Sequence, residues 1–150
     1  MDLWQTITVE AAGQSPLWAD VLIRTHQRES LPVFSALGRA RYALGLETIY
    51  EGYLLHYGRP RLFAPPDRDT GLLLGDYLFA HGLVRVAEYD AVDAVGDLSA
   101  LISLCAQLRA DGLPGDGEAW AETAAKLEGE REPLSDSVEN ALAAHRRRVG

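Results

Sequence analysis

The chain has 150 residues, of which 47% are apolar, and its formal net charge is −8. This length suffices for one domain with a buried core, and the apolar share excludes a disordered chain. The negative charge argues against nucleic acid and against anionic membrane surfaces as partners, because both are bound mainly through Lys and Arg.

Other features of the chain predict a cytoplasmic protein without a membrane span. The single cysteine, Cys105, cannot form an intramolecular disulfide, which fits a reducing compartment. The N-terminus lacks the basic and apolar regions of a signal peptide. The longest apolar stretch, 71–86, is interrupted by Asp76 and His81, and it is too short and too polar to cross a bilayer.

Apolar residues at helical spacing, punctuated by Pro and Gly, predict an all-α bundle of about five to seven helices in a single domain, 1–150. The first helix is expected to begin at Ser15–Pro16, where Ser caps and Pro occupies the first position. The helices are expected, in chain order, from Ser15 to about Arg28, from about Ser30 to about Leu54, from Asp69 or Thr70 to about Glu88, from Asp90 to Ala110, from Glu118 to Leu127 and from Asp136 to Arg148.

Two further patterns concern helix packing and helix ends. Gly38, Gly45 and Gly52 recur at seven-residue spacing, which indicates close helix packing or a chance recurrence, with a functional approach of the backbone as the alternative. Asp136 and Glu139 have the spacing of a capping box for the last helix. The arginines near the C-terminus of that helix suit its dipole, and they do not by themselves indicate a basic binding tail.

Two segments resemble landmarks of the trans-type polyprenyl diphosphate synthases. Gly58-Arg59-Pro60 opens a proline-rich loop, and Gly75-Asp76-Tyr77-Leu78-Phe79-Ala80 follows on the next helix. In that family an aspartate-rich motif ends one helix, an Arg-Arg-Gly-x-Pro segment follows, and a Gly-Asp-Tyr-Leu signature lies beyond. The resemblance covers about 34–108, with the C-terminal helices at 118–148 outside it. Enzymes of that family are longer, so the resemblance implies only their N-terminal half.

The resemblance implies a site for Mg²⁺ and a prenyl diphosphate, in which carboxylates hold the metal and basic residues hold the phosphates. Aligned without a gap, Glu47 and Glu51 take the places of the first and last aspartates of the acidic motif. His56 and Tyr57 take the places of the paired arginines, so that Arg59 remains as the basic residue of this segment. No second aspartate-rich motif follows.

These residues also have simpler interpretations, which the sequence leaves open. Glu47 and Glu51, four residues apart, share one helix face, where they are either structural acids or a metal pair. Asp76 either pairs with a basic residue or belongs to the substrate site. His56 is either a ligand residue or the partner of a carboxylate or a backbone carbonyl.

The sequence favours a non-catalytic or weakly catalytic, polyprenyl-synthase-like protein that serves as an interaction subunit or a small-molecule-binding module. No catalytic residue is assigned; Arg59, His56 and Asp76 are the candidate substrate-binding residues, and no cofactor is expected. The partners expected are a second copy or a synthase-like subunit, because half of the family fold leaves apolar faces uncovered. The alternative is a reduced prenyltransferase or prenyl-diphosphate-binding enzyme with Mg²⁺ on Glu47 and Glu51.

Overall fold

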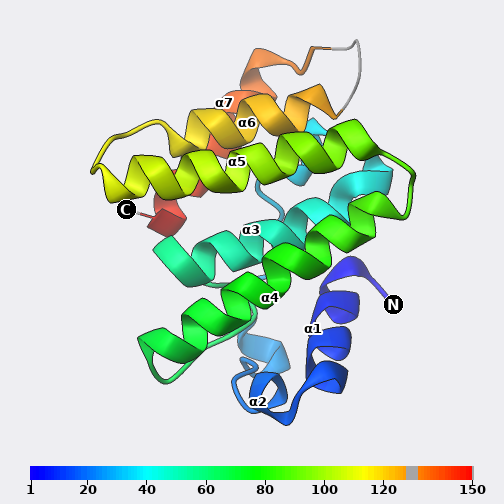
Figure 1. The fold of residues 1–150 in the computed structure, drawn as a ribbon, viewed down its shortest axis with the longest axis vertical. Helices are drawn as coiled ribbons and strands as arrows, with labels where there is room; N and C mark the ends of the chain where they lie inside the picture. Colours follow the sequence, from blue (N-terminus) through cyan, green and yellow to red (C-terminus); the bar gives the residue numbers. More distant parts are fainter. Residues whose placement is uncertain (128–131, 150) are drawn as a thin grey trace.

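The computed structural model describes residues 1–127 and 132–149. Over these residues the chain forms seven α-helices, three short 3₁₀ turns and one isolated bridge between Leu22 and Phe63 (Figure 1). The predicted all-α bundle is therefore confirmed. The helices are α1 (Leu3–Gln14), α2 (Pro16–Ala19), α3 (Ala43–Tyr57), α4 (Arg68–Ala87), α5 (Val92–Ala110), α6 (Asp116–Lys126) and α7 (Ser135–Val149).

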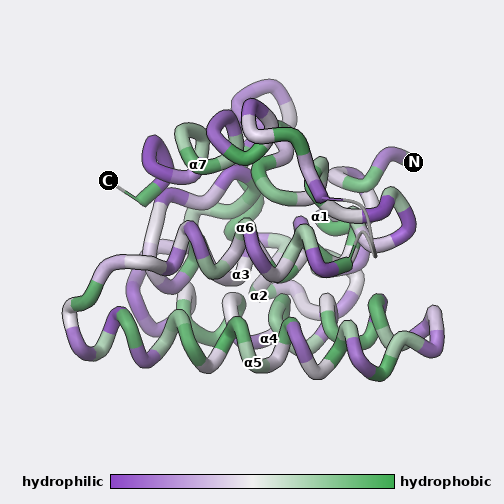
Figure 2. Tube along the Cα trace, turned by 90° about the horizontal axis from the view of Figure 1, so that it is seen from above, coloured by the Kyte–Doolittle hydropathy of each residue, from purple (hydrophilic) through white to green (hydrophobic). Residues whose placement is uncertain are grey.

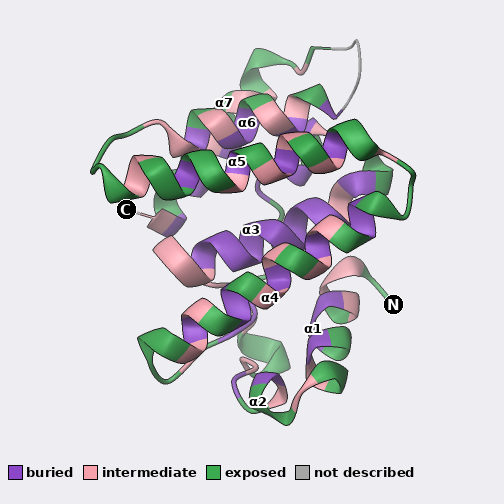
Figure 3. Ribbon diagram, viewed as in Figure 1, coloured by how far each residue is buried: buried purple, intermediate pink, exposed green. Residues whose placement is uncertain are grey.

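The longer helices are arranged in layers around α3. Seen from above, α4 and α5 lie in one outer layer, α3 and α6 lie behind them, and α7 lies on the far side (Figure 2). Nearly the whole of α3 is buried, whereas α4 and α5 have exposed outer faces (Figure 3). Polar side chains on the central helix α3 are therefore buried as well and need partners within the protein.

Helices α3 and α4 approach closely because both carry glycines seven residues apart. A Cβ on Gly82 would lie 2.4 Å from the Cγ1 atom of Ile49, and one on Gly52 would lie 2.8 Å from the carbonyl oxygen of Gly75. Close packing is thus confirmed for the Gly45 and Gly52 pattern, and α4 supplies a matching pair. The close contact fixes the end of α3 against the beginning of α4.

The apolar side chains form two clusters. One lies between α3, α5, α6 and α7 and contains stacked and edge-on aromatic rings around Phe34 and Trp120. The other joins α1 and α2 to α4 and to the loop before it, and its buried members are Ile7, Ala11, Trp18, Val21, Leu62, Phe63, Leu74 and Leu78.

The N-terminal region differs from the prediction. Helix α1 was not expected, and its start is fixed by a capping box in which Asp2 accepts from the backbone N–H of Gln5 at 2.8 Å. The helix predicted from Ser15 to Arg28 is wrong beyond Ala19. There the chain leaves helical geometry because its backbone bonds to the loop before α4, as in the 2.9 Å bond from Ile23 N–H to the Leu62 carbonyl.

The helix predicted from Ser30 is also wrong in its first half, because α3 begins only at Ala43. The backbone N–H groups of Val33 and Ser35 instead donate to the carboxylate of Glu47, at 3.1 and 3.3 Å. This tertiary contact satisfies donors that a helix would otherwise use, and 3₁₀ turns fill the segment up to Tyr42.

The remaining helices agree with the prediction to within about two residues. Asp67, not Asp69 or Thr70, caps α4, and α7 begins at Ser135, so that Asp136 lies inside its first turn rather than at the cap. Within the described residues, none of the helices is both long and apolar enough to cross a membrane.

Candidate functional site

A cavity of about 580 Å³ lies where the end of α3, the loop 58–67 and the start of α4 meet the segment 23–29. Its wall includes the apolar side chains of Ile23, Leu55, Phe63, Pro65 and Leu72. Its polar lining residues are Gln27, Glu29, His56, Arg59, Arg61, Asp67 and Arg68. Pockets of this size, mainly apolar with a few polar groups, are typical of small-molecule sites. We call this cavity the loop pocket.

The loop pocket joins two of the three predicted substrate-binding residues, His56 and Arg59, whereas Asp76 is not part of its lining. The Nε2 atom of His56 lies 3.0 Å from the Oδ1 atom of Asp76. In the structure this histidine is therefore the partner of a carboxylate. The ring also stacks on Phe79, with centroids 5.0 Å apart. Gly75 leaves the space for the ring, since a Cβ there would lie 2.6 Å from it.

Two guanidinium groups are available at the loop pocket. Both Arg59 and Arg68 are exposed, and among residues 1–127 and 132–149 their side chains have no hydrogen-bond or ion-pair partner. The two lining carboxylates, in contrast, are engaged. Asp67 caps α4 by accepting from the backbone N–H of Thr70 at 2.7 Å, which lowers the pKa of this carboxyl group, and Glu29 pairs with Arg148.

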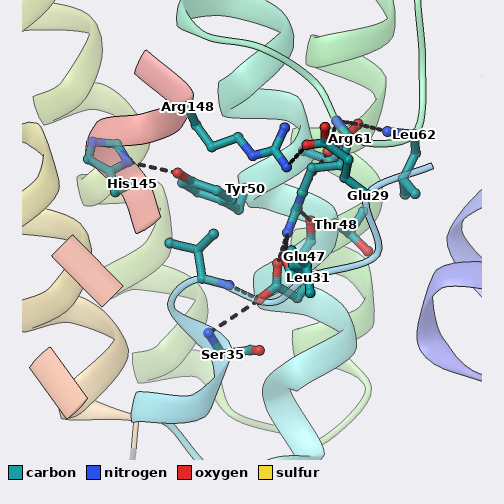
Figure 4. Close-up of polar contacts among 12 residues, drawn as sticks. Glu29, Leu31, Ser35, Glu47, Thr48, Tyr50, Arg61, Leu62, His145 and Arg148 are labelled. Atoms are coloured by element: carbon teal, nitrogen blue, oxygen red, sulfur yellow. Dashed lines mark hydrogen bonds and ion pairs between the residues drawn. The ribbon is translucent and has the colours of Figure 1, made fainter. Parts of the chain in front are cut away.

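A buried ion group is centred on Arg61, one of the residues that line the loop pocket. The side chain of Arg61 is fully buried and bonds to the carboxylates of Glu47 and Glu51, at 2.6 and 3.0 Å (Figure 4). Its guanidinium also lies over the rings of Trp4 and Tyr50, 4.8 and 5.1 Å from their centroids. Burial by itself lowers the pKa of Arg61, but the attraction of the two carboxylates outweighs this and raises it.

The two predicted metal ligands, Glu47 and Glu51, share one face of α3 as expected, but both are directed at Arg61. Glu51 also accepts from the backbone N–H groups of Arg61 and Leu62, at 2.9 and 2.8 Å. Among the described residues, no group of three or more His, Cys, Asp or Glu side chains could hold a metal ion. The magnesium site stays a prediction, and it would require the carboxylates to exchange Arg61 for a metal.

Sequence reasoning missed Arg61, which lies two residues beyond Arg59 and was not considered as the partner of Glu47 and Glu51. The available signal was a basic residue ten positions after Glu51, and no helical spacing relates the two. Arg68 and Glu29 were missed as well. Their place at the pocket depends on loops whose course has no local sequence signature.

A second polar group joins α3 to α5, α6 and α7. The hydroxyl of Tyr50 lies 2.7 Å from Nδ1 of His145, and the hydroxyl of Tyr53 donates to Asp116. Arg109 binds the same carboxylate at 2.6 Å. Burial alone would raise the pKa of Asp116, but its neighbours His145, Tyr53 and Arg109 lower it well below the ordinary range. Burial, followed by the adjacent Asp116, raises the pKa of Tyr53. This group links the helices from the buried His145 out to Arg109, whose side chain is 32% exposed.

Comparison with models of protein families, with curated proteins and with solved structures gave no match. The function is therefore inferred from the geometry of the loop pocket and from the motifs of the sequence.

Proposed function

We propose that this protein is a helical module that binds a small molecule with an anionic head and an apolar body in the loop pocket. The observation that carries the proposal is the pairing of two unengaged guanidinium groups, Arg59 and Arg68, with an apolar wall in one cavity. Arginine is the side chain best suited to phosphate and carboxylate oxygens, because its planar fork donates two parallel hydrogen bonds.

The charges around the loop pocket support an anionic head over a cationic one. Glu29 is neutralised by Arg148, and Asp67 is committed to the cap of α4. The group formed by Arg61, Glu47 and Glu51 has a formal charge of −1, but it is buried, and backbone N–H groups donate to both of its carboxylates. The exposed charges at the mouth that lack an ionic partner are therefore the two guanidinium groups of Arg59 and Arg68 and the one capping carboxylate of Asp67, so that positive charge is in excess.

The resemblance to the trans-type polyprenyl diphosphate synthases supports a prenyl diphosphate as the ligand class. Gly58, Arg59 and Pro60, which carry part of that resemblance, line the loop pocket, and the signature that begins at Gly75 places its first residues against His56. We propose a retained binding scaffold without the chemistry, since Glu47 and Glu51 are both engaged by Arg61. The module is non-catalytic or weakly catalytic on this proposal.

The binding test is a calorimetric titration of the protein with geranyl diphosphate in the presence of EDTA. We expect saturable binding. Arg59→Gln and Arg68→Gln should each lower the affinity about tenfold, because each removes one charge-assisted contact to the ligand. Arg147→Gln is the matched control, since that arginine is exposed on α7 away from the pocket lining. Geraniol, which lacks the diphosphate, shows how much affinity the anionic head contributes. Inorganic diphosphate, which lacks the prenyl chain, shows the contribution of the apolar body. Equal affinity of parent and both pocket variants would contradict the proposal.

The same titration separates binding from the magnesium-dependent alternative. On the proposal, binding does not require Mg²⁺. A prenyltransferase site would instead show binding that needs Mg²⁺ and that is lost in the Glu47→Gln, Glu51→Gln double variant. If the double variant is folded and binds as tightly as the parent with and without Mg²⁺, the metal pair is ruled out.

An interaction role is a second candidate, favoured by the outer face of α4. Leu73, Ala80 and Val84 lie at spacings of seven and four, and they are exposed along one side of this helix, with Leu73 at 59% and Val84 at 55%. We propose that a second copy or a synthase-like subunit covers this face. Light scattering tests self-association. If the protein remains monomeric as its concentration increases, the second copy is ruled out and a synthase-like subunit stays as the proposed partner.

A further inference from the structure

We propose that Arg148, on the last turn of α7, is a positioning residue that makes the loop pocket selective for anions. It does so by neutralising the one exposed lining carboxylate that is not part of a helix cap and by holding the backbone of Arg59. This inference rests on the proposed function, because it concerns the same pocket.

The contacts of Arg148 connect α7 to two lining residues. Its guanidinium forms an ion pair with Glu29, and its Nη1 atom lies 3.4 Å from the carbonyl oxygen of Arg59. The backbone carbonyl of Arg148 in turn accepts from the N–H of Arg59 at 2.9 Å. Figure 4 shows this side chain extending from α7 toward Glu29. The side chain of Arg148 is 8% exposed, so the guanidinium is largely buried while the carboxylate of Glu29 faces solvent.

The backbone at the end of α7 packs against the start of the loop 58–67. A Cβ on Gly58 would lie 2.9 Å from the carbonyl oxygen of Arg148 and 3.1 Å from Val149. One turn earlier, His145 is held by the hydroxyl of Tyr50 at 2.7 Å. The end of α7 is thus fixed to the centre of the bundle, and through Arg148 it fixes the course of residues 58 and 59.

An anionic ligand requires the carboxylate of Glu29 to be neutralised, because Glu29 lies at the pocket wall. Its side chain is 52% exposed and lines the loop pocket, and its backbone N–H donates to the carbonyl of Arg61 at 3.2 Å. This backbone bond keeps Glu29 at the wall whatever its side chain does. Without Arg148 the carboxylate would face the same space as Arg59, where it would compete for that guanidinium and repel an anionic head.

The neighbouring arginines of α7 provide a natural comparison. Arg146 and Arg147 are exposed and form no ion pair with a lining residue among the described part of the chain, whereas Arg148 pairs with Glu29. The sequence does not distinguish the three consecutive arginines from one another. In the structure, Arg148 is the one whose side chain extends toward Glu29 at the loop pocket. A role in the helix dipole would be shared by all three, whereas a role in anion selectivity belongs to Arg148.

The test compares affinities for geranyl diphosphate, measured by calorimetry at low ionic strength, in five proteins. We expect Arg148→Gln to bind about tenfold more weakly than the parent, and Arg147→Gln to bind like it. Glu29→Gln should change the affinity by less than about twofold, because its charge is already neutralised. The Glu29→Gln, Arg148→Gln double variant should recover most of the loss, since the unpaired carboxylate is gone.

The recovery separates a positioning role from a merely structural one. If Arg148 only stabilised α7, removal of Glu29 would not restore affinity, and that result would overturn the inference. Equal binding by parent and Arg148→Gln would overturn it too, while leaving the proposed function standing. If Arg148→Gln does not fold, Glu29→Gln alone decides: an increase in affinity of about tenfold would show that Glu29 is not neutralised in the parent. No binding by the parent would overturn both proposals.

Discussion

Replacing Arg61 with methionine is expected to be among the most destabilising single changes in the chain. The substitution keeps an unbranched side chain of similar length but leaves the carboxylates of Glu47 and Glu51 without their shared cation. Both carboxylates have at most 1% of their side-chain surface exposed, so water cannot replace the lost donors. The two negative charges also lie one helical turn apart on α3, where they repel each other.

The magnitude follows from the contacts. Each carboxylate loses one charge-assisted hydrogen bond from the arginine side chain, and such bonds contribute about 1.5–3 kcal/mol each. Breaking a buried ion pair by removal of one partner typically costs about 3–5 kcal/mol, which agrees with that sum. For a chain of this size the loss corresponds to a decrease in Tm of roughly 6–20 °C.

Urea unfolding followed by circular dichroism measures this effect, with Arg147→Met as the exposed control. A second comparison tests the cause: adding Glu47→Gln and Glu51→Gln to Arg61→Met should recover at least half of the lost free energy of unfolding, because no buried charge is then left unpaired. A loss below about 1 kcal/mol for Arg61→Met would refute the reasoning, since that is the range of an exposed ion pair.

Three further predictions test the packing and the internal polar group. Gly82→Ala should destabilise the protein by about 1–3 kcal/mol, because the new Cβ meets Ile49. Gly96→Ala, whose new Cβ has no atom within 4 Å, should stabilise it by up to about 1 kcal/mol. Equal effects of the two variants in thermal unfolding would contradict the close contact of α3 and α4. The pKa of Asp116 is lower in the folded than in the unfolded state, so its contribution to stability is present above the unfolded pKa and is lost as the pH falls toward the folded one. Asp116→Asn should therefore flatten the decline of stability below about pH 4 in acid titrations, and an unchanged slope would argue against this assignment. Cys105 is 2% exposed and burial raises the pKa of its thiol to about 12, so iodoacetamide at pH 8 should modify it only after unfolding; fast labelling of the native protein would contradict its burial.

The helices that the sequence predicted well are those with strong local signals. Helix α5 has apolar residues at helical spacing over its whole length, and the glycine-rich break after Ala110 ends it where expected. The loop before α4 was also anticipated, because three prolines lie within it. In these cases the sequence is sufficient to predict the structure, because the conformation is determined by residues close together in the chain.

The segment 30–42 shows why local chemistry was insufficient elsewhere. Its apolar spacing suits a helix, but Glu47 takes two of its N–H groups, and that partner lies more than ten residues away. The candidate site has the same difficulty. His56 and Arg59 were found through motifs, whereas the lining residue Glu29 meets its partner Arg148 only through the fold, 119 residues apart in the chain.

The glycines of α3 and α4 also limit how this chain can change in length. Gly45 faces Gly82, and Gly52 faces Gly75, so the same seven-residue interval is kept on both antiparallel helices. Inserting or deleting one residue between the two glycines of either helix would rotate one of them out of the contact by about 100°, since each residue turns a helix by that angle. A seven-residue insertion would keep both on the shared face. We therefore expect related chains to vary in length in their loops, or by whole pairs of turns in these two helices, and not by single residues within them.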